Sequence, residues 1–426
     1  GVSFTSSTLP DILPNTTYTL VARLNYATDS LALWVNPGLN ADETSQLPAV
    51  TRTYTGTNWS TALRLFSTGG SPVMWDDLVV ATSWDDLGTV VDTATDEDNG
   101  HLLGSISLRE AVKYSPTGSL ITFAPGLSGQ TLTLTHADGD MEIPGAVTID
   151  ATALPGGLTV NGNNTSRHFF VGSGKALTLR GLTLTGGNGV GSGETVAGSI
   201  WVHGTLNLHR CTLTGNASTS HGGAIYSVGS LRATDCTFSE NTAGADSGAI
   251  NVFSGTAELF RCTLSANTAS RAGAIWMQGT STTLSHCTVT GNRSTGGSSA
   301  GGLMALAGTL SLQPCTVSQN TGNGSGGGLF LSTPAVNIAN SIIAGNADTS
   351  SRPDIFRFDN GGTLNATGTN LIGSNESVAT QFPAAANLVG TAAAPVNPKL
   401  SPLGYFGGPV QTMQPLIGSP AIDAAG

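Results

Sequence analysis

Between residues 177 and 345, short segments in which alternate residues are apolar recur in sets of three, separated by Gly, Asn, Ser and Thr. Such alternation predicts strands that bury one face. A phrase such as RCTLTGN, around Cys211, returns along this stretch with its cysteines 25, 26, 25 and 28 residues apart. Strands this short, repeated at a fixed period, predict a solenoid with one turn per period.

A second phrase, GGAIYS and its relatives, lies between successive copies of the first. Corresponding strands of neighbouring turns would pair in parallel, about 4.8 Å apart. Because crossovers between parallel strands are right-handed, the sequence predicts an all-β protein built on a right-handed parallel β-helix with three-strand coils of about 25 residues. We assign residues 151–375 to this β-helix.

Two residues of the first phrase define predicted ladders. The cysteines would face inward as stacked, reduced and unreactive thiols, because stacked Cβ atoms lie farther apart than a disulfide allows. Each copy also ends in Asn, which we interpret as a turn residue that tolerates left-handed geometry and bonds the coils above and below. The ladder residues are Cys211, Cys236, Cys262, Cys287 and Cys315, and Asn216, Asn241, Asn267, Asn292, Asn320 and Asn346.

The second phrase predicts an outward stripe. Its Ile or Leu points inward, and so does the residue two positions later, so the residue between them must point outward. Five of the six outward residues are aromatic or Met, and the stripe is a candidate binding surface. Three occupants are open: another part of this chain, a protein partner or a second copy, and a glycan. The six residues are Trp201, Tyr226, Asn251, Trp276, Met304 and Phe330.

The flanking regions differ from the repeats. Residues 89–150 are expected to form an N-terminal cap and the first coils, with a helix over 106–115 that turns Leu108, Ala111 and Val112 inward and Arg109, Glu110 and Lys113 outward. Residues 376–426 are expected to be an irregular cap over the last coil. Residues 1–88 alternate like strands around a turn at 27–29 and resemble the C-terminal part of a concanavalin-like or laminin-G-like jelly roll, which predicts a partial β-sandwich.

Composition narrows the function classes. Only 10% of the 426 residues are charged, and the net charge is −11. The sparse basic residues exclude nucleic acid as an expected partner. No apolar run is long enough for a membrane span.

Two chemical hypotheses remain. Many parallel β-helices cleave polysaccharides, so a lyase or glycoside hydrolase is the alternative function, but the coils show no obvious pair of carboxylates. His221, in SHGGA, is the nearest trace of a catalytic phrase and is interpreted as a solvated loop residue. The acidic loop with Asp92, Asp96 and Asp98 could bind Ca²⁺, or it is simply a solvated loop before the cap. No other cofactor is expected.

A resemblance to a known family indicates where the protein is expected to be located. The order DEDNG, SLREAV, ITFAPGLSGQTLTLT, VTIDATALPGG and LTLRGLTLTGG resembles the CSLREA-type β-helix domains of bacterial surface proteins, which are similar to polymorphic outer-membrane proteins. Leu102 and Ile106 stand about where that family often has cysteines, so no cap disulfide is expected. NPKLSPLGYFGGPVQTMQPLIGSPAIDAAG resembles the choice-of-anchor Q segment. The resemblance implies a secreted, surface-attached bacterial protein. Because the coils show no clear catalytic set, we expect this chain to be a non-catalytic structural or adhesive module of a larger surface protein.

Overall fold

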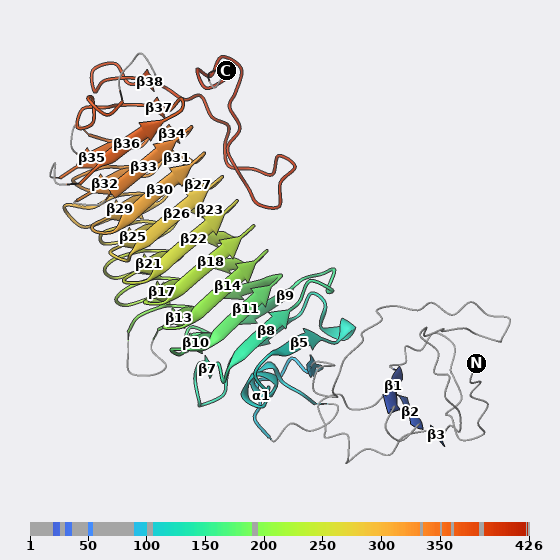
Figure 1. Ribbon diagram of the computed structural model, residues 1–426. Coiled ribbons are helices and arrows are strands. Elements are labelled where there is room, and N and C mark those ends of the chain that lie inside the picture. Colours follow the sequence, from blue (N-terminus) through green and yellow to red (C-terminus); the bar gives the residue numbers. More distant parts are fainter. Residues whose placement is uncertain are drawn as a thin grey trace.

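The computed structural model describes residues 20–25, 30–35, 50–53, 89–99, 105–189, 195–332, 335–349, 352–358, 362–382, 387–422 and 424. From residue 89 onward the chain forms a parallel β-solenoid of about nine turns with about 26 residues per turn, as the repeats predict. Figure 1 shows the coils stacked in sequence order, so each strand pairs with its counterpart one coil away.

Three long parallel sheets run along the solenoid, and we call them sheets 1, 2 and 3. Sheet 1 has nine strands: β7 (Met141–Glu142), β10 (Phe169–Val171), β13 (Ile200–Val202), β17 (Ile225–Ser227), β21 (Ile250–Val252), β25 (Ile275–Met277), β29 (Leu303–Ala305), β32 (Leu329–Leu331) and β35 (Ile355–Arg357).

Sheet 2 has eleven strands: β4 (Thr89–Val91), β5 (Ser119–Phe123), β8 (Ala146–Asp150), β11 (Ala176–Arg180), β14 (Thr205–His209), β18 (Ser230–Thr234), β22 (Thr256–Phe260), β26 (Ser281–Ser285), β30 (Thr309–Gln313), β33 (Ala335–Ala339) and β36 (Leu364–Thr367).

Sheet 3 also has eleven strands: β6 (Thr131–Thr133), β9 (Leu158–Asn161), β12 (Leu182–Thr185), β15 (Thr212–Thr214), β19 (Thr237–Ser239), β23 (Thr263–Ser265), β27 (Thr288–Thr290), β31 (Thr316–Ser318), β34 (Ile342–Ile343), β37 (Leu371–Ile372) and β38 (Leu388–Val389). A small fourth sheet joins β16 (Ala217–Ser218), β20 (Thr242–Ala243), β24 (Thr268–Ala269) and β28 (Arg293–Ser294).

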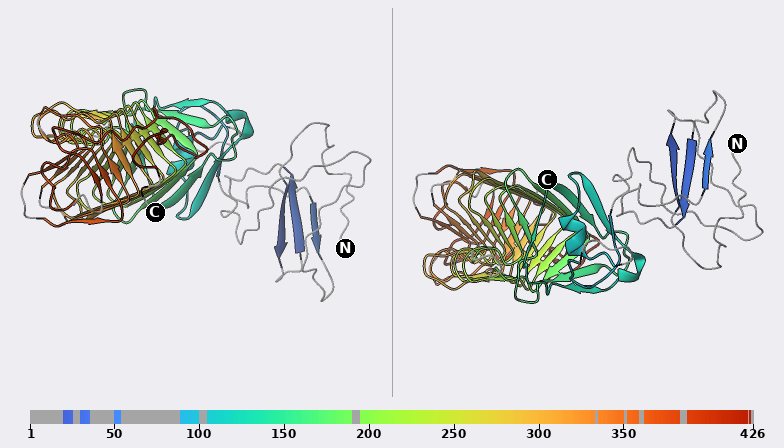
Figure 2. Two further views of the ribbon diagram at one scale, coloured as in Figure 1. Left: turned by 90° about the horizontal axis from the view of Figure 1, so that it is seen from above. Right: turned by 90° about the horizontal axis from the view of Figure 1, so that it is seen from below.

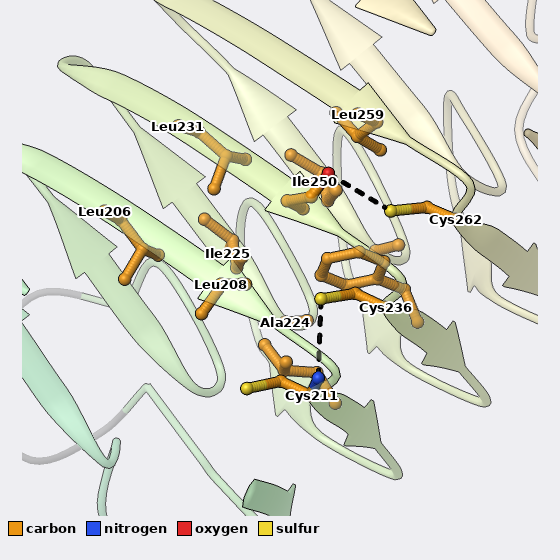
Figure 3. Packing of buried hydrophobic residues seen from close by; sticks show 14 of the residues in the cluster. Leu206, Leu208, Cys211, Ala224, Ile225, Leu231, Cys236, Ile250, Leu259 and Cys262 are labelled. Carbon is orange, nitrogen blue, oxygen red and sulfur yellow. Dashed lines mark hydrogen bonds between the residues drawn. The ribbon is translucent and has the colours of Figure 1, made fainter. Parts of the chain in front are cut away.

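The inward side chains of the three long sheets meet in one continuous core. In one coil, Ile225 from sheet 1, Leu231 from sheet 2 and Phe238 from sheet 3 are all fully buried. Figure 3 shows this packing, with Cys211, Cys236 and Cys262 each one coil away from the next. Because every coil repeats the same inward pattern, like residues stack on like, and the solenoid buries its apolar positions without large sheets.

The five cysteines are free and buried, as the sequence predicted. The amide N–H of Cys211 donates to Sγ of Cys236 over 3.5 Å, and that of Cys262 donates to Sγ of Cys287 over 3.4 Å. Ser341 continues the column, and its hydroxyl accepts from the amide of Cys315. Burial raises the pKa of Cys262, which keeps the thiol protonated.

The six asparagines form a ladder that runs in one direction. Nδ2 of each donates to Oδ1 of the next, for example from Asn241 to Asn267 over 3.0 Å, and the backbone N–H does the same. Nδ2 also donates to a carbonyl of the preceding coil. At the C-terminal end, Asn346 donates to Oδ1 of Asp354 over 2.9 Å. The predicted bonding between coils is therefore confirmed, and a carboxylate ends the ladder.

The expected left-handed geometry is displaced by one residue. The residues with positive φ are those just before the ladder positions, such as Asp235 (57°) before Cys236 and Glu240 (57°) before Asn241. The ladder asparagines thus have negative φ, and their side chains stabilise the turn by hydrogen bonds from inside the solenoid.

The cap helix α1 (Leu108–Lys113) confirms a helix in the predicted segment, but two of its charged residues point the other way. Arg109 and Glu110 are buried, and only Lys113 is exposed as expected. Ser107 and Glu110 form a capping box, and Glu110 also accepts from the amide of Asn99. The charged residues of SLREA are buried because they fasten neighbouring loops to the helix.

The C-terminal region does more than close the last coil. Val378 and Phe382 are fully buried at the end of the core. The chain then runs back beside sheet 3, as Figures 1 and 2 show. The hydroxyl of Thr263 donates to the carbonyl of Gln411, and Thr288 Oγ1 lies 3.0 Å from Thr412 Oγ1. Residues 395–417 therefore cover part of sheet 3, and a groove of about 670 Å³ separates them from the last coils.

In the N-terminal region the structure describes three strands: β1 (Leu20–Asn25), β2 (Ser30–Val35) and β3 (Val50–Thr53). They form an antiparallel sheet in the order β1-β2-β3, and β1 and β2 flank the turn predicted at residues 27–29. The rest of residues 1–88 lies outside the described residues, so the partial sandwich stays a prediction.

Candidate functional site

The predicted stripe is a real column on the outer face of sheet 1. Its six residues pair in register from β13 to β32, and each lies between two inward residues of its strand. The same register adds Phe170 of β10 at one end and Phe356 of β35 at the other. We call these eight residues the outer column.

The outer column is less exposed than expected. Trp201 and Tyr226 are partly exposed, but Asn251, Trp276, Met304 and Phe330 are buried. Trp276, Met304, Phe330 and Phe356 form an apolar cluster of their own with Ala272 and Ala300, separate from the solenoid core. Ala272 and Ala300 pair with each other in the turn that precedes sheet 1, so the chain's own turns contribute to covering this half. The exposed half of the outer column runs from Phe170 to Tyr226.

Phe253 belongs to this face and was not predicted. It lies two residues after Asn251 and therefore on the same side of the chain, and it is 47% exposed. Its ring centroid lies 5.9 Å from that of Tyr226 and 6.3 Å from that of Trp276, with interplanar angles of 29° and 13°. Phe253 thus bridges the gap left by Asn251, and its outward spacing from Asn251 was the signal in the sequence.

A polar cluster borders these rings. His221 Nδ1 lies 2.6 Å from Asp246 Oδ2, and Arg271 donates to Asp246 Oδ1 over 2.9 Å. Asn251 Nδ2 also donates to Asp246 Oδ2, over 3.3 Å. His221, Asp246 and Arg271 occupy the same place in three successive coils, just before the GGAIYS-type phrase. We call His221, Asp246, Arg271, Tyr226 and Phe253 the lateral patch.

Two residues of the outer column beside the lateral patch each have a buried polar atom with no hydrogen-bond partner among the described residues. These atoms are Nε1 of Trp276 and Oδ1 of Asn251. Unpaired buried polar groups are uncommon and cost stability. In this stretch of the outer column the buried polar groups are therefore less completely hydrogen-bonded than those of the Asn ladder inside.

The other end of the exposed half carries an aromatic group around Trp201. Its ring lies 5.0 Å from Phe170 and 4.9 Å from His203, centroid to centroid. The guanidinium of Arg167 lies over the Trp201 ring at 5.1 Å and donates to Asp140 over 2.8 Å. This group is therefore held from beneath by a buried ion pair.

His168, which follows Arg167 in the sequence, is a buried structural histidine. Its Nδ1 lies 2.9 Å from Ser199 Oγ, and its Nε2 faces two backbone carbonyls. Burial lowers its pKa to about 4, so it is neutral at ordinary pH and holds two coils together.

The carboxylates of the acidic loop make separate contacts with the cap. Asp92 accepts from the amide of Ile106, Asp96 pairs with Arg109, and Asp98 pairs with Lys113. Burial opposes ionisation of Asp96, but Arg109 and the amides of Thr135 and His136 outweigh it and lower its pKa. Among the described residues no three His, Cys, Asp or Glu side chains converge as ligands would. These carboxylates fasten the cap, and calcium binding stays a prediction.

Comparison with known proteins agrees with the fold. Residues 224–396 match the right-handed β-helix region, and residues 210–228 match the repeat of the Chlamydia polymorphic membrane proteins. No curated protein and no solved structure matches the chain. The middle of the chain is thus similar to right-handed β-helix regions and to the repeat of a bacterial membrane protein family. The other resemblances, to CSLREA-type, choice-of-anchor Q and laminin-G-like segments, stay predictions.

None of the helices in the described part of the chain is long and apolar enough to cross a bilayer.

Proposed function

We propose that this chain is a rigid, non-catalytic module of a bacterial cell-surface protein, and that it holds a protein partner on the lateral patch. The observation that carries the proposal is that the exposed rings of Tyr226 and Phe253 lie beside the His221–Asp246–Arg271 cluster, with the centroids of the His221 and Tyr226 rings 6.1 Å apart. Aromatic residues and Arg are the residue types that dominate binding energy at protein interfaces. The stacked coils beneath supply a stiff support.

The ring geometry favours a protein over a glycan. Sugars bind best on a free aromatic face, but Phe253 lies nearly parallel to Trp276 and at 29° to Tyr226, so its faces turn toward its neighbours. What it offers outward is its edge, which suits packing by side chains of a partner.

The enzyme alternative lacks a second acid. Glycoside hydrolysis uses two carboxylates on either side of the bond. The described contacts of the lateral patch include one carboxylate, that of Asp246, and Arg271 already pairs with it. Asp246 therefore links three coils by pairing with both His221 and Arg271.

Binding of the fluorescently labelled chain to bacterial and animal cells tests the proposal. Phe253→Ala and Arg271→Ala should each weaken binding severalfold, because both remove exposed contact groups. Phe260→Ala is the matched control, since Phe260 is an exposed ring on sheet 2. Treatment of the cells with trypsin should abolish binding. Binding that survives trypsin but is lost after periodate oxidation of surface sugars would overturn the protein partner in favour of a glycan.

A further inference from the structure

The outer face of sheet 3 carries two columns of hydroxyl-bearing residues in register. Each strand from β6 to β31 presents two outward residues, and all but one of these are Thr or Ser. The first column is Thr131, Thr159, Thr183, Thr212, Thr237, Thr263, Thr288 and Thr316. The second column is Thr133, Asn161, Thr185, Thr214, Ser239, Ser265, Thr290 and Ser318. Neither column contains a charged residue.

The C-terminal segment divides this face into two parts. In the later coils it lies on the columns, and Thr263, Thr288 and Thr290 are buried. In the five coils from β6 to β19, all ten column residues remain partly or fully exposed. The contact between Thr288 and Thr412 shows that the columns can hydrogen-bond outward to another hydroxyl.

The spacing of the uncovered columns is fixed by the backbone. Neighbouring coils lie about 4.8 Å apart, and alternate residues of one strand about 6.6 Å apart. Beneath the outward residues, Leu184, Leu213 and Phe238 are fully buried and hold the strands in place. Ser239 donates to Thr214 over 2.9 Å, so the side chains also order one another. The result is a rigid two-dimensional lattice of hydroxyl and methyl groups.

We infer that the uncovered part of sheet 3 binds the surface of ice. Its two repeat distances are close to the oxygen spacings on a face of ordinary ice. A threonine hydroxyl anchors a water molecule, and its methyl group limits how neighbouring waters turn, so the columns hold water in lattice positions before contact. Because the array is rigid, little conformational entropy is lost on binding. An uncharged face also avoids the strongly held hydration shells that charged groups would keep.

Adsorption of the labelled, purified chain to a growing ice crystal tests the inference, together with thermal hysteresis of the same solution. The native chain should coat the ice and lower its growth temperature. Thr212→Tyr places a bulky ring at the centre of the array and should remove most of both effects. Thr283→Tyr, at an outward Thr of β26 in sheet 2, is the matched control and should change neither. Thr183→Tyr repeats the test at a second position, and thermal unfolding of each variant establishes that it is folded.

Several results would overturn the inference. They are no adsorption by the native chain, equal losses in Thr212→Tyr and Thr283→Tyr, and binding to microcrystalline cellulose without binding to ice, which would assign the columns to a polysaccharide. The inference concerns a different face from the lateral patch, so its failure would leave the proposed function unchanged. Failure of the proposed function would likewise leave this inference unchanged.

Discussion

The Asn ladder and the outer column both place one side chain in each coil, yet they differ in almost every other respect. The ladder keeps one residue type over six coils and satisfies its amide groups. The outer column changes from Trp to Tyr, Asn, Met and Phe, and within the described part of the chain Trp276 Nε1 and Asn251 Oδ1 find no hydrogen-bond partner. In the ladder each Asn must bond the Asn of the next coil, so the residue type is kept, whereas a side chain of the outer column only has to fit beside its neighbours. Residue type in the outer column is therefore free to change with function.

The largest expected effect is on the ladder. Asn267→Ala removes a side chain that accepts from Asn241 and donates to Asn292 and to the carbonyl of Phe238. Several buried groups lose their partners, so the free energy of unfolding should fall by about 4–6 kcal/mol. Chemical denaturation measures it. Asn207→Ala, an outward Asn of sheet 2, should stay within about 0.5 kcal/mol. Equal losses would contradict the distinction between inside and outside.

The covered half of the outer column and the exposed ring of Phe253 beside it should respond differently to truncation. Trp276→Ala removes a buried ring and should lower the free energy of unfolding by about 3 kcal/mol. Phe253→Ala removes a half-exposed ring and should cost less than about 1 kcal/mol while weakening partner binding. Thermal unfolding and cell binding of both variants check this. A stable Trp276→Ala variant would mean that the covered half is not a packed cluster.

Asp354, at the end of the Asn ladder, should make the stability of the fold depend on pH. Burial raises the pKa of Asp354 to about 6, above the usual 3.8 of an unfolded chain. The folded state then holds this proton more tightly, so the contribution is fully present below about pH 4 and is lost as pH rises to about 6. The loss is at most about 3 kcal/mol. Relative to Asp354→Asn, the native chain should lose stability between pH 4 and pH 7. Parallel pH profiles of the two proteins would contradict this.

The smallest effect is expected at the thiols. Cys262→Ser should lower the free energy of unfolding by about 1 kcal/mol, because Ser341 already occupies the same column. Titration with a thiol reagent should find all five cysteines unreactive until the protein is denatured. Rapid labelling of the folded chain would show that the coils open, and it would place the thiols nearer the outside than the structure does.

The sequence predicted the features that repeat and missed those that depend on side-chain packing. The period, the inward cysteines and the bonding of the asparagines follow from register alone, because each coil copies the last. The burial of Arg109 was missed because its partner, Asp96, lies on a separate loop whose position no pattern reveals. His221, Asp246 and Arg271 differ in type, so their contact emerges only when coils 25 residues apart are stacked.

The return of the C-terminal segment has a consequence for how the chain folds. The contact between Thr263 and Gln411 joins residues 148 positions apart, whereas most contacts in the solenoid join adjacent coils. Contacts between neighbours can form one after another as the chain becomes available, but this distant contact must wait until the coils beneath it exist. Synthesis from the N-terminus would therefore allow stepwise assembly, with docking of residues 395–417 as the final event. Until then the threonines of β23 and β27 would face water, as those of the earlier coils do in the finished protein.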